Sequence, residues 1–480
     1  MKSIILSKGL WLFNGLLKIY EESFTNTIVK KIQASLKVSF DNSYLIQKLK
    51  QEEKEVITET FFYEKVIKPL IKFFPFKTLL ENSLLLKLLT STPVLGLIWV
   101  LHIVSYGFLP TSLSLIVSLG LMVLFLCRLA FKSVKAPSTT FVLSSVFILA
   151  MLFISGLFNP LNYDTLSIMM IFGVTILLMI TYILVMEDKN IFYITLYGLG
   201  LTIFLYSLYG IYQKLVGVPV DPSWLDESSS QVMRIYSVFK NPNVFGEFLT
   251  LTLPLMFAGL QVSKKWSSKL FFFIVFMLGG FNILLSFSRG SMVSLALAMF
   301  LLIAIRDRRY LPLFFIGLLF SPIILPESIY ARLLTIVQGG DSSLDYRASI
   351  YLASIDMLRD HFVLGVGLGN FKELYKAYAY TASKTFHAHN TYLMIWLEMG
   401  LLGLVSWLTF VFLWVKKMFT LKERNPYSYY TIAALVGIIG CSVQGMMEHI
   451  FHNYDIVFYF FLVIAIGYLA MKLNKEVADA

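Results

Sequence analysis

Residues 385–404 read TFHAHNTYLMIWLEMGLLGL, a stretch in which a polar, histidine-containing segment runs directly into an apolar one. The apolar part begins a run long enough to be a membrane span. His387, His389 and Glu398 therefore stand where a predicted span begins. Titratable side chains are costly to keep beside lipid, so groups retained at such a place indicate a functional site.

The composition of the whole chain also indicates a membrane protein. Of its 480 residues, 57% are hydrophobic and 14% are charged, and the mean hydropathy is +0.74. A soluble protein of this length could not bury so much apolar surface, so the sequence predicts an all-α polytopic membrane protein. The two cysteines, Cys127 and Cys441, fall inside apolar runs and offer neither a disulfide framework nor a metal-ligand spacing.

Apolar runs of about 17 to 25 residues predict about twelve membrane spans. The connections after the first and seventh spans are very tight, so the first two spans could instead form a re-entrant pair. We place the spans near residues 93–109, 111–127, 138–157, 165–186, 191–212, 243–262, 270–286, 290–305, 310–326, 391–415, 429–447 and 454–471.

Charge gives these spans an orientation. If the N-terminus is cytoplasmic, the outer connections at 110, 158–164 and 448–453 carry no lysine or arginine, whereas the inner loops carry sixteen. This positive-inside pattern predicts a multi-pass protein of the bacterial cytoplasmic membrane with both termini cytoplasmic. The inner cations are Arg128, Lys132, Lys135, Lys189, Lys264, Lys265, Lys269, Arg306, Arg308, Arg309, Lys416, Lys417, Lys422, Arg424, Lys472 and Lys475.

The spans divide the chain into four predicted segments. Residues 1–90 hold fourteen lysines and nine acids with apolar residues at helical intervals, typical either of amphipathic helices on the inner membrane surface or of a small cytosolic helical subdomain. Residues 91–326 contain spans one to nine, and 391–480 contain the last three with a short cytoplasmic tail. Between them, 327–390 form a long outer loop, which we expect to be folded because LDYRASIYLASIDML has helical spacing. The net charge of +11 follows from membrane orientation and indicates no nucleic-acid partner.

Three arginines near predicted outer membrane edges or in the outer loops stand in an ordered-looking context, where the positive-inside rule disfavours cations. They are Arg234, Arg289 and Arg347. Each alone could be a snorkelling or helix-capping residue, and Glu247 and Asp345 could pair with them internally. All three together favour a shared anionic target, because a guanidinium presents a planar fork suited to phosphate.

Histidines show the same bias, since five of the six fall on the predicted outer side. An imidazole with a pKa near neutrality can take a proton from an attacking hydroxyl. A metal site is an alternative, but His-x-His is a weak signal and EHIFH lacks the helical His-Glu-x-x-His order, so we expect none. The residues that could converge as ligands are His387, His389, Glu448, His449 and His452. The glycines of GVGLGNF, 365–371, predict a turn rather than a phosphate loop.

The stretch HNTYLMIWLEMGLLG resembles the signature of bacterial O-antigen ligases and O-antigen polymerases: His389, Asn390, Gly400 and Gly403 match its His-Asn-x9-Gly-x2-Gly spacing. Three further stretches are similar to that superfamily and stand in the expected order. They are RIYSVFKNPNVFGEFLTLTLPL, SFSRGSMVSL and YRASIYLASIDMLRDHFVLGVGLGNF. Residues 1–90 lie outside the resemblance.

The resemblance implies about twelve spans and a folded outer loop over a lipid-accessible cavity. It implies transfer of a glycan from undecaprenyl diphosphate to a hydroxyl of a lipid, polysaccharide or protein, with inversion and without a metal or cofactor. By similarity, His389 is the base, with Glu398 to orient it and His387 as the rival base. Asn390 and the three outer arginines would bind substrate, Arg234 and Arg289 holding the diphosphate.

Other classes of function fit part of the sequence. A transporter or a flippase for lipid-linked glycans would also have many spans and a polar cavity, but it predicts titratable residues near the bilayer midplane and an inverted repeat. Few midspan charges and no obvious repeat are present. A scaffold for envelope assembly leaves the outer arginines unexplained.

Overall fold

The structure is a computed structural model that describes residues 83–129, 139–157, 163–185, 189–217, 233–338, 342–380, 385–419 and 425–478. These residues form helices and no strand, which confirms the all-α prediction. The segment predicted to be amphipathic, 1–90, lies outside the described residues up to 82. The helices are α7 (Leu84–Leu89), α8 (Thr92–Ser105), α9 (Thr111–Leu129), α10 (Thr139–Leu157), α11 (Tyr163–Val185), α12 (Lys189–Val216), η3 (Ser237–Phe239), α13 (Pro242–Val262), α14 (Trp266–Ser286), α15 (Arg289–Arg306), η4 (Arg308–Tyr310), α16 (Leu311–Leu319), α17 (Ser321–Ile324), α18 (Glu327–Gln338), α19 (Ser342–Asp360), α20 (Phe371–Tyr378), α21 (Thr391–Phe419), α22 (Pro426–Gln444) and α23 (Tyr454–Ala478).

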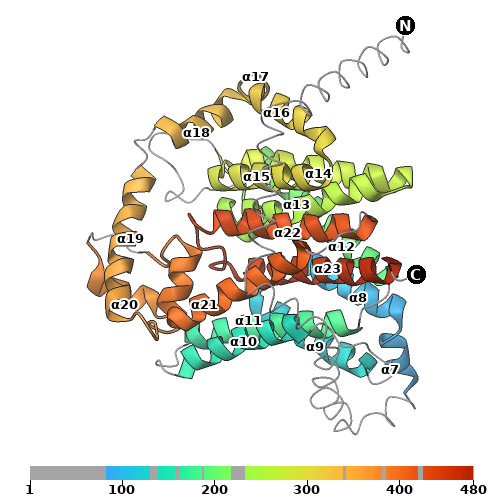
Figure 1. The fold of residues 1–480 in the computed structure, drawn as a ribbon, viewed down its shortest axis with the longest axis horizontal. Helices are drawn as coiled ribbons and strands as arrows, with labels where there is room; N and C mark the ends of the chain where they lie inside the picture. Colours follow the sequence, from blue (N-terminus) through green and yellow to red (C-terminus); the bar gives the residue numbers. More distant parts are fainter. Residues whose placement is uncertain are drawn as a thin grey trace, which may run out of the picture.

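Most long helices lie side by side as one bundle, with α19 and α20 at one end and the C-terminus at the other (Figure 1). Within the described residues, nine helices are long and apolar enough to cross a membrane, and α8 and part of α10 are shorter apolar helices. The centre is formed by α13, α22 and α23, which pack against one another. The side chains of α23 from Ile456 to Met471 are almost entirely buried, as expected for a helix that is apolar on all sides and surrounded by others.

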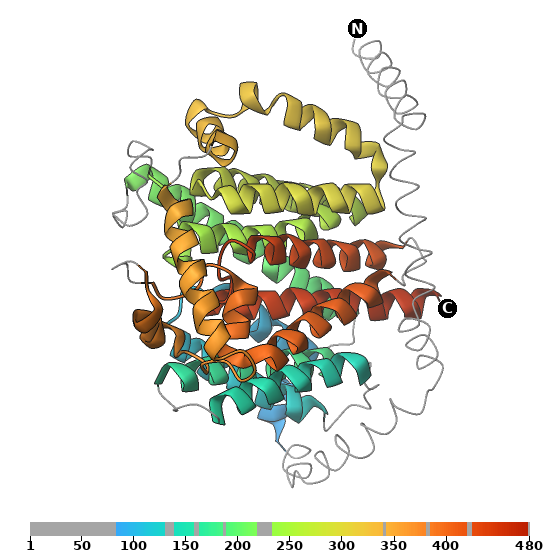
Figure 2. The same ribbon diagram turned by 60° about the vertical axis from the view of Figure 1, so that its left-hand side comes forward.

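The predicted span at 310–326 is wrong as a single helix. The chain there forms α16, of nine residues, and the single turn α17. Pro322 interrupts the run, because a proline has no N–H to donate to the carbonyl four residues earlier. At about 1.5 Å per residue α16 is too short to cross a bilayer core about 30 Å thick. Helices α16, α17 and α18 instead run as an arc beside α15, back toward the end that holds α19 (Figure 2).

The long outer loop is helical, as predicted. Helices α19 and α20 share a small apolar core with the start of α21, formed around Ile350, Met357, Phe371, Tyr375 and Leu397. The GVGLGNF stretch is a turn, with all three of its glycines at positive φ. This core fixes the loop to the helix that begins two residues after His389.

Helix α21 is kinked at Gly400, and the kink receives the outer loop. Gly400 has φ 70° and ψ −176°, outside helical geometry. The amide of Val366 donates to the carbonyl of Leu397 at 2.6 Å, and the amide of Leu401 donates to the carbonyl of Val363 at 3.1 Å. A Cβ on Gly400 would collide with that Val363 carbonyl. The first glycine of the His-Asn-x9-Gly spacing is therefore required by this backbone contact.

We expect Gly400→Ala to destabilise the protein by about 3 kcal/mol or more, because positive-φ strain and a backbone collision add. The measurement is the apparent melting temperature and the monodisperse yield of purified protein. Gly280→Ala in α14 is the matched control, because a Cβ there has nothing within 4 Å. An unchanged melting temperature in Gly400→Ala would contradict the role given to the kink.

Candidate active site

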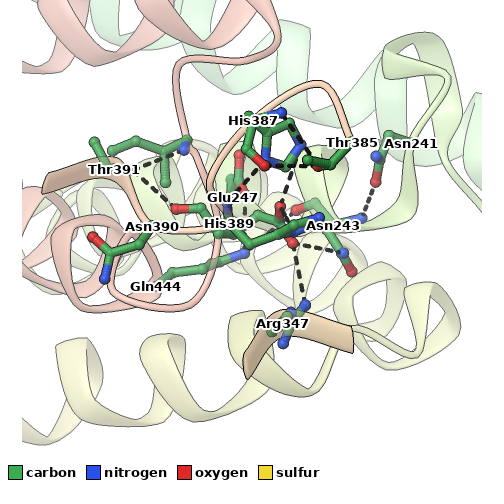
Figure 3. A network of polar contacts seen from close by, with 12 residues as sticks. Asn241, Asn243, Glu247, Arg347, Thr385, His387, His389, Asn390, Thr391 and Gln444 are labelled. Carbon is green, nitrogen blue, oxygen red and sulfur yellow. Dashed lines mark hydrogen bonds and ion pairs between the residues drawn. The ribbon is translucent and has the colours of Figure 1, made fainter. Parts of the chain in front are cut away.

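A polar cluster lies where the outer loop meets the ends of α13, α21 and α22 (Figure 3). Its centre is Glu448, in the connection between α22 and α23. The Nδ1 atom of His389 lies 2.9 Å from Oε1 of Glu448, and Nε2 of His387 lies 3.7 Å from the same oxygen. The exposed fractions of these side chains are 11% for His387, 19% for His389 and 14% for Glu448, so all three are shielded from bulk water.

The other oxygen of Glu448 faces the arginines. Oε2 lies 3.4 Å from a terminal nitrogen of Arg347 and accepts a hydrogen bond of 3.4 Å from the amide of Asn243. Arg234 donates to Oδ1 of Asn243 at 2.8 Å and to the carbonyl of Ser286 at 2.9 Å. Figure 3 shows Arg347 approaching the cluster from the side opposite His387. One carboxylate thus separates the histidine side of the cluster from its guanidinium side.

The carboxylate of Glu448 determines which nitrogen of His389 donates a hydrogen bond. Burial alone would raise the pKa of Glu448, but the hydrogen bond with His389 and the positive charge beside this carboxylate outweigh burial and lower that pKa to about 2. Glu448 is therefore ionised at neutral pH and can only accept. Nδ1 of His389 must carry the hydrogen in this pair, which leaves Nε2 with its lone pair for a substrate proton.

His387 supports His389 through the backbone. Burial lowers the pKa of His387 well below its usual value, so its ring is neutral. Its Nδ1 accepts from the amide of His389 at 3.2 Å, and the hydroxyl of Tyr351 donates to the carbonyl of His389 at 3.0 Å. These contacts hold His389 at a φ of 47°, a left-handed conformation that costs a residue other than glycine about 1–3 kcal/mol. Strain retained at a histidine in a polar cluster indicates that its orientation matters.

The two residues after His389 join the start of α21 to the connection between α22 and α23. Asn390, predicted to bind substrate, uses both ends of its amide within the protein: Oδ1 accepts from the amides of Tyr392 and Leu393 at 3.0 Å, and Nδ2 donates to the carbonyl of Met446 at 3.0 Å. It is thus the N-terminal cap of α21. Thr391 donates to the carbonyl of Glu448 at 2.9 Å and accepts from the amide of Ile450 at 3.0 Å. The start of α21 is therefore fixed against the segment that carries Glu448.

Glu398, predicted to orient His389, lies elsewhere. Its Oε1 accepts from the amide of Gly369 at 2.9 Å. The two residues are nine positions apart, about 13 Å along a helix, which is beyond the reach of a glutamate side chain. The carboxylate that contacts His389 is Glu448, which the sequence indicated only as one of several converging acids and histidines.

Three further residues singled out from the sequence lie at the rim of the cluster. Arg289 begins α15, next to Gly290, which faces the side chain of Gln444 at the end of α22. His449 and His452 lie beside His387, with ring centroids 5.9 Å and 4.4 Å from it. Burial lowers the pKa of His449 to about 3, so it is neutral. His361 is the outer histidine outside this group.

The cluster also has the geometry of a possible metal site. The ligand atoms of His387, His389 and Glu448 all lie within 4.8 Å of one another. Two imidazoles and a carboxylate are a common set for Zn²⁺ and for Fe²⁺. The Glu448 carboxylate already contacts an imidazole and a guanidinium, so these residues also form an ion-pair network that needs no metal. An activity assay with a chelator distinguishes the metal site from the ion-pair network.

A second feature adjoins the histidines. A cavity of about 190 Å³, here called the lateral cavity, lies between α10, α11 and α21 and is lined by His449 and His452 on one side and by Glu398 on another. It is separate from Arg234 and Arg347, which do not line it.

The fold and the cluster define a class of protein: an all-helical, multi-pass membrane protein with a polar site where a folded outer loop meets the helix ends. Residues 272–408 match the model of the family described as O-antigen ligase. This confirms the resemblance to that family over residues 272–408. The match includes Arg289, Arg347 and His389. Among curated proteins, none matches the chain. The match supports a membrane protein of the O-antigen ligase or polymerase type.

Proposed function

We propose that this protein transfers a glycan from undecaprenyl diphosphate to an acceptor hydroxyl at the outer face of the cytoplasmic membrane, with inversion and without a metal ion. The observation that carries the proposal is the pair formed by His389 and the ionised Glu448, with Arg347 on the other carboxylate oxygen. A base beside guanidinium groups suits a reaction that deprotonates a hydroxyl and releases a diphosphate.

In the proposed step, Nε2 of His389 takes the proton of the acceptor hydroxyl as its oxygen attacks the anomeric carbon. The bond from that carbon to the diphosphate breaks, and the leaving diphosphate carries the electron pair. Arg347, Arg234 and Arg289 stabilise this charge, because guanidinium groups fixed near developing charge need little reorganisation. Glu448 holds His389 in the competent tautomer and stabilises the imidazolium that forms.

We expect Arg289→Lys to impair transfer although the charge is kept, because an ammonium cannot supply two parallel hydrogen bonds to a phosphate. Arg289→Ala should be worse, by about a hundredfold to a thousandfold, the usual cost of losing one electrostatic donor. The measurement is transfer from a defined undecaprenyl-diphosphate glycan by purified protein in liposomes, with and without extensive chelation. Arg359→Lys is the control, since Arg359 is an exposed arginine of the same outer region.

Activity should survive chelation. Loss of activity with a chelator, restored by one divalent metal, would contradict the metal-free mechanism and assign His387, His389 and Glu448 to a metal site. No consumption of any lipid-linked glycan by folded protein would instead favour the transporter alternative.

The proposal also requires the site to face outward. We expect a cysteine placed at Lys376, on the exposed side of α20, to react with an impermeant thiol reagent applied from outside the membrane. A cysteine at Ser267, in the predicted inner loop and at the start of α14, should react only after the membrane is opened. Both substitutions are made after Cys127 and Cys441 are replaced. The reverse pattern would invert the topology and exclude an extracytoplasmic reaction.

A further inference from the structure

The lateral cavity has two ends of different chemistry. Its apolar part is formed by side chains of three membrane-spanning helices, α10, α11 and α21, so it extends into the layer that lipid tails occupy. These side chains include Ile148, Leu152, Phe172, Met399 and Trp407. Its polar part lies toward the outer loop and includes Asp164, Lys372, Glu398, His452 and Tyr454. A cavity with this division fits an amphipathic molecule better than a wholly polar or wholly apolar one.

The polar end is acidic. Glu398 is 8% exposed and is held by the amide of Gly369. Gly369 lies close against Asp164, because a Cβ there would come within 2.9 Å of the Asp164 side chain. The two carboxyl groups can exchange hydrogen bonds with hydroxyls, whereas the arginines that suit a diphosphate, Arg234, Arg289 and Arg347, do not line the cavity. Lys372, the cation at this end, lies 4.9 Å from the ring centroid of Phe386.

The cavity is connected to the proposed base through the ring of His387, on the side of Glu448 away from Arg347. His452 lines the cavity and its ring lies 4.4 Å from that of His387, which in turn lies 4.2 Å from that of His389. Arg347 contacts the other oxygen of Glu448. An inverting displacement needs its acceptor on the face of the sugar opposite the diphosphate. Within the described residues, Nδ1 of His449, another lining residue, is buried without a hydrogen-bond partner.

We propose that the lateral cavity binds the acceptor and that this acceptor is a lipid-linked glycan. Its hydrocarbon chain lies between α10, α11 and α21, and its neutral, hydroxyl-bearing sugar lies at the acidic end beside His452. The inference rests on the proposed function, because it assigns the second substrate of that reaction. It excludes the donor lipid from this cavity, since the donor diphosphate belongs with the arginines.

Binding can be tested without transfer. The probe is dodecyl β-D-glucoside with a photoreactive diazirine in its alkyl chain, added to the purified protein in nanodiscs and mapped by mass spectrometry. We expect adducts on residues that line the cavity. Leu152→Trp fills the apolar part and should lower this labelling about tenfold, equivalent to losing burial of two methylene groups. Leu166→Trp is the matched control, because Leu166 is 51% exposed on α11 and does not line the cavity.

Two further arms identify the ligand. Glu398→Gln should weaken labelling by the glucoside probe but not by a diazirine dodecanol, which lacks the sugar. If Leu152→Trp does not fold, the comparison of these two probes tests the proposal. Undecaprenyl diphosphate should leave labelling in place. Displacement by undecaprenyl diphosphate would assign the cavity to the donor chain and overturn the proposal. Labelling spread evenly over lipid-facing helices, or equal for both probes in every variant, would also overturn it. A protein that binds the probe in the cavity but transfers no glycan would contradict only the proposed function.

Discussion

His389→Ala should fold and insert normally but lose glycan transfer by about a hundredfold to ten-thousandfold, the range typical of removing a general base. The reason is geometric: Nδ1 is held by Glu448 at 2.9 Å, so Nε2 is the atom presented for a proton. The measurement is the transfer rate from a defined undecaprenyl-diphosphate glycan at saturating substrate. Melting temperature is measured beside it.

The backbone of His389 calls for a second variant. Because its φ is 47°, alanine adds strain there, whereas asparagine tolerates the left-handed region better. His389→Asn should therefore stay folded and be equally inactive. His361→Asn, in the same outer loop, is the control and should keep its activity. Near-normal transfer by folded His389→Asn would remove this histidine from the mechanism. If His387→Ala were the inactive variant instead, the rival base would be correct.

Glu448→Gln should lower kcat by about a thousandfold or more, by analogy with the loss seen when a carboxylate that orients a catalytic histidine becomes an amide. An amide can donate to Nδ1 and so favour the wrong tautomer, and it cannot stabilise the imidazolium. Loss of this ionised partner should also shift the pH profile of kcat/KM, which a purely structural residue would not do. Glu448 itself, with a pKa lowered to about 2, should not titrate in the neutral range.

The variant Glu398→Gln distinguishes the role of Glu398 from that of Glu448. In the proposed arrangement it should act mainly on the KM for the acceptor, with much less effect on kcat. Glu373→Gln, at an exposed surface pair, is the control for a lost charge. A large fall in kcat for Glu398→Gln with little effect of Glu448→Gln would restore the assignment made from the sequence alone.

The prediction from sequence worked where local chemistry decides the outcome. Long apolar runs cannot remain in water, so the positions of most membrane helices followed from hydropathy. The run at 310–326 is as apolar as its neighbours, yet Pro322, which has no N–H to donate, divides the run into α16 and α17. The division of the chain into four segments and the cytoplasmic placement of both termini stay predictions.

The carboxylate that contacts His389 could not be predicted from local sequence in the same way. The family resemblance assigns Glu398 to orient His389, but a helix carries it about 13 Å away. Glu448 is 59 residues from His389 and reaches it only because Thr391 and Asn390 bind the start of α21 to the connection after α22. Such pairing depends on how distant helices pack, and no local pattern specifies it. The one available signal was the placing of Glu448 beside His449 and His452 in an outer connection.

Because His389 and Glu448 are far apart in sequence, exchanging one segment of the chain can separate the base from its partner. The match to the O-antigen ligase family covers residues 272–408, so it contains His389 and Arg347 but neither Glu448 nor Arg234. A chimaera that received only residues 272–408 from this protein would take its base from one parent and the partner of that base from the other. Exchange of acceptor preference between relatives would therefore require α21 and the α22–α23 connection to be inherited together.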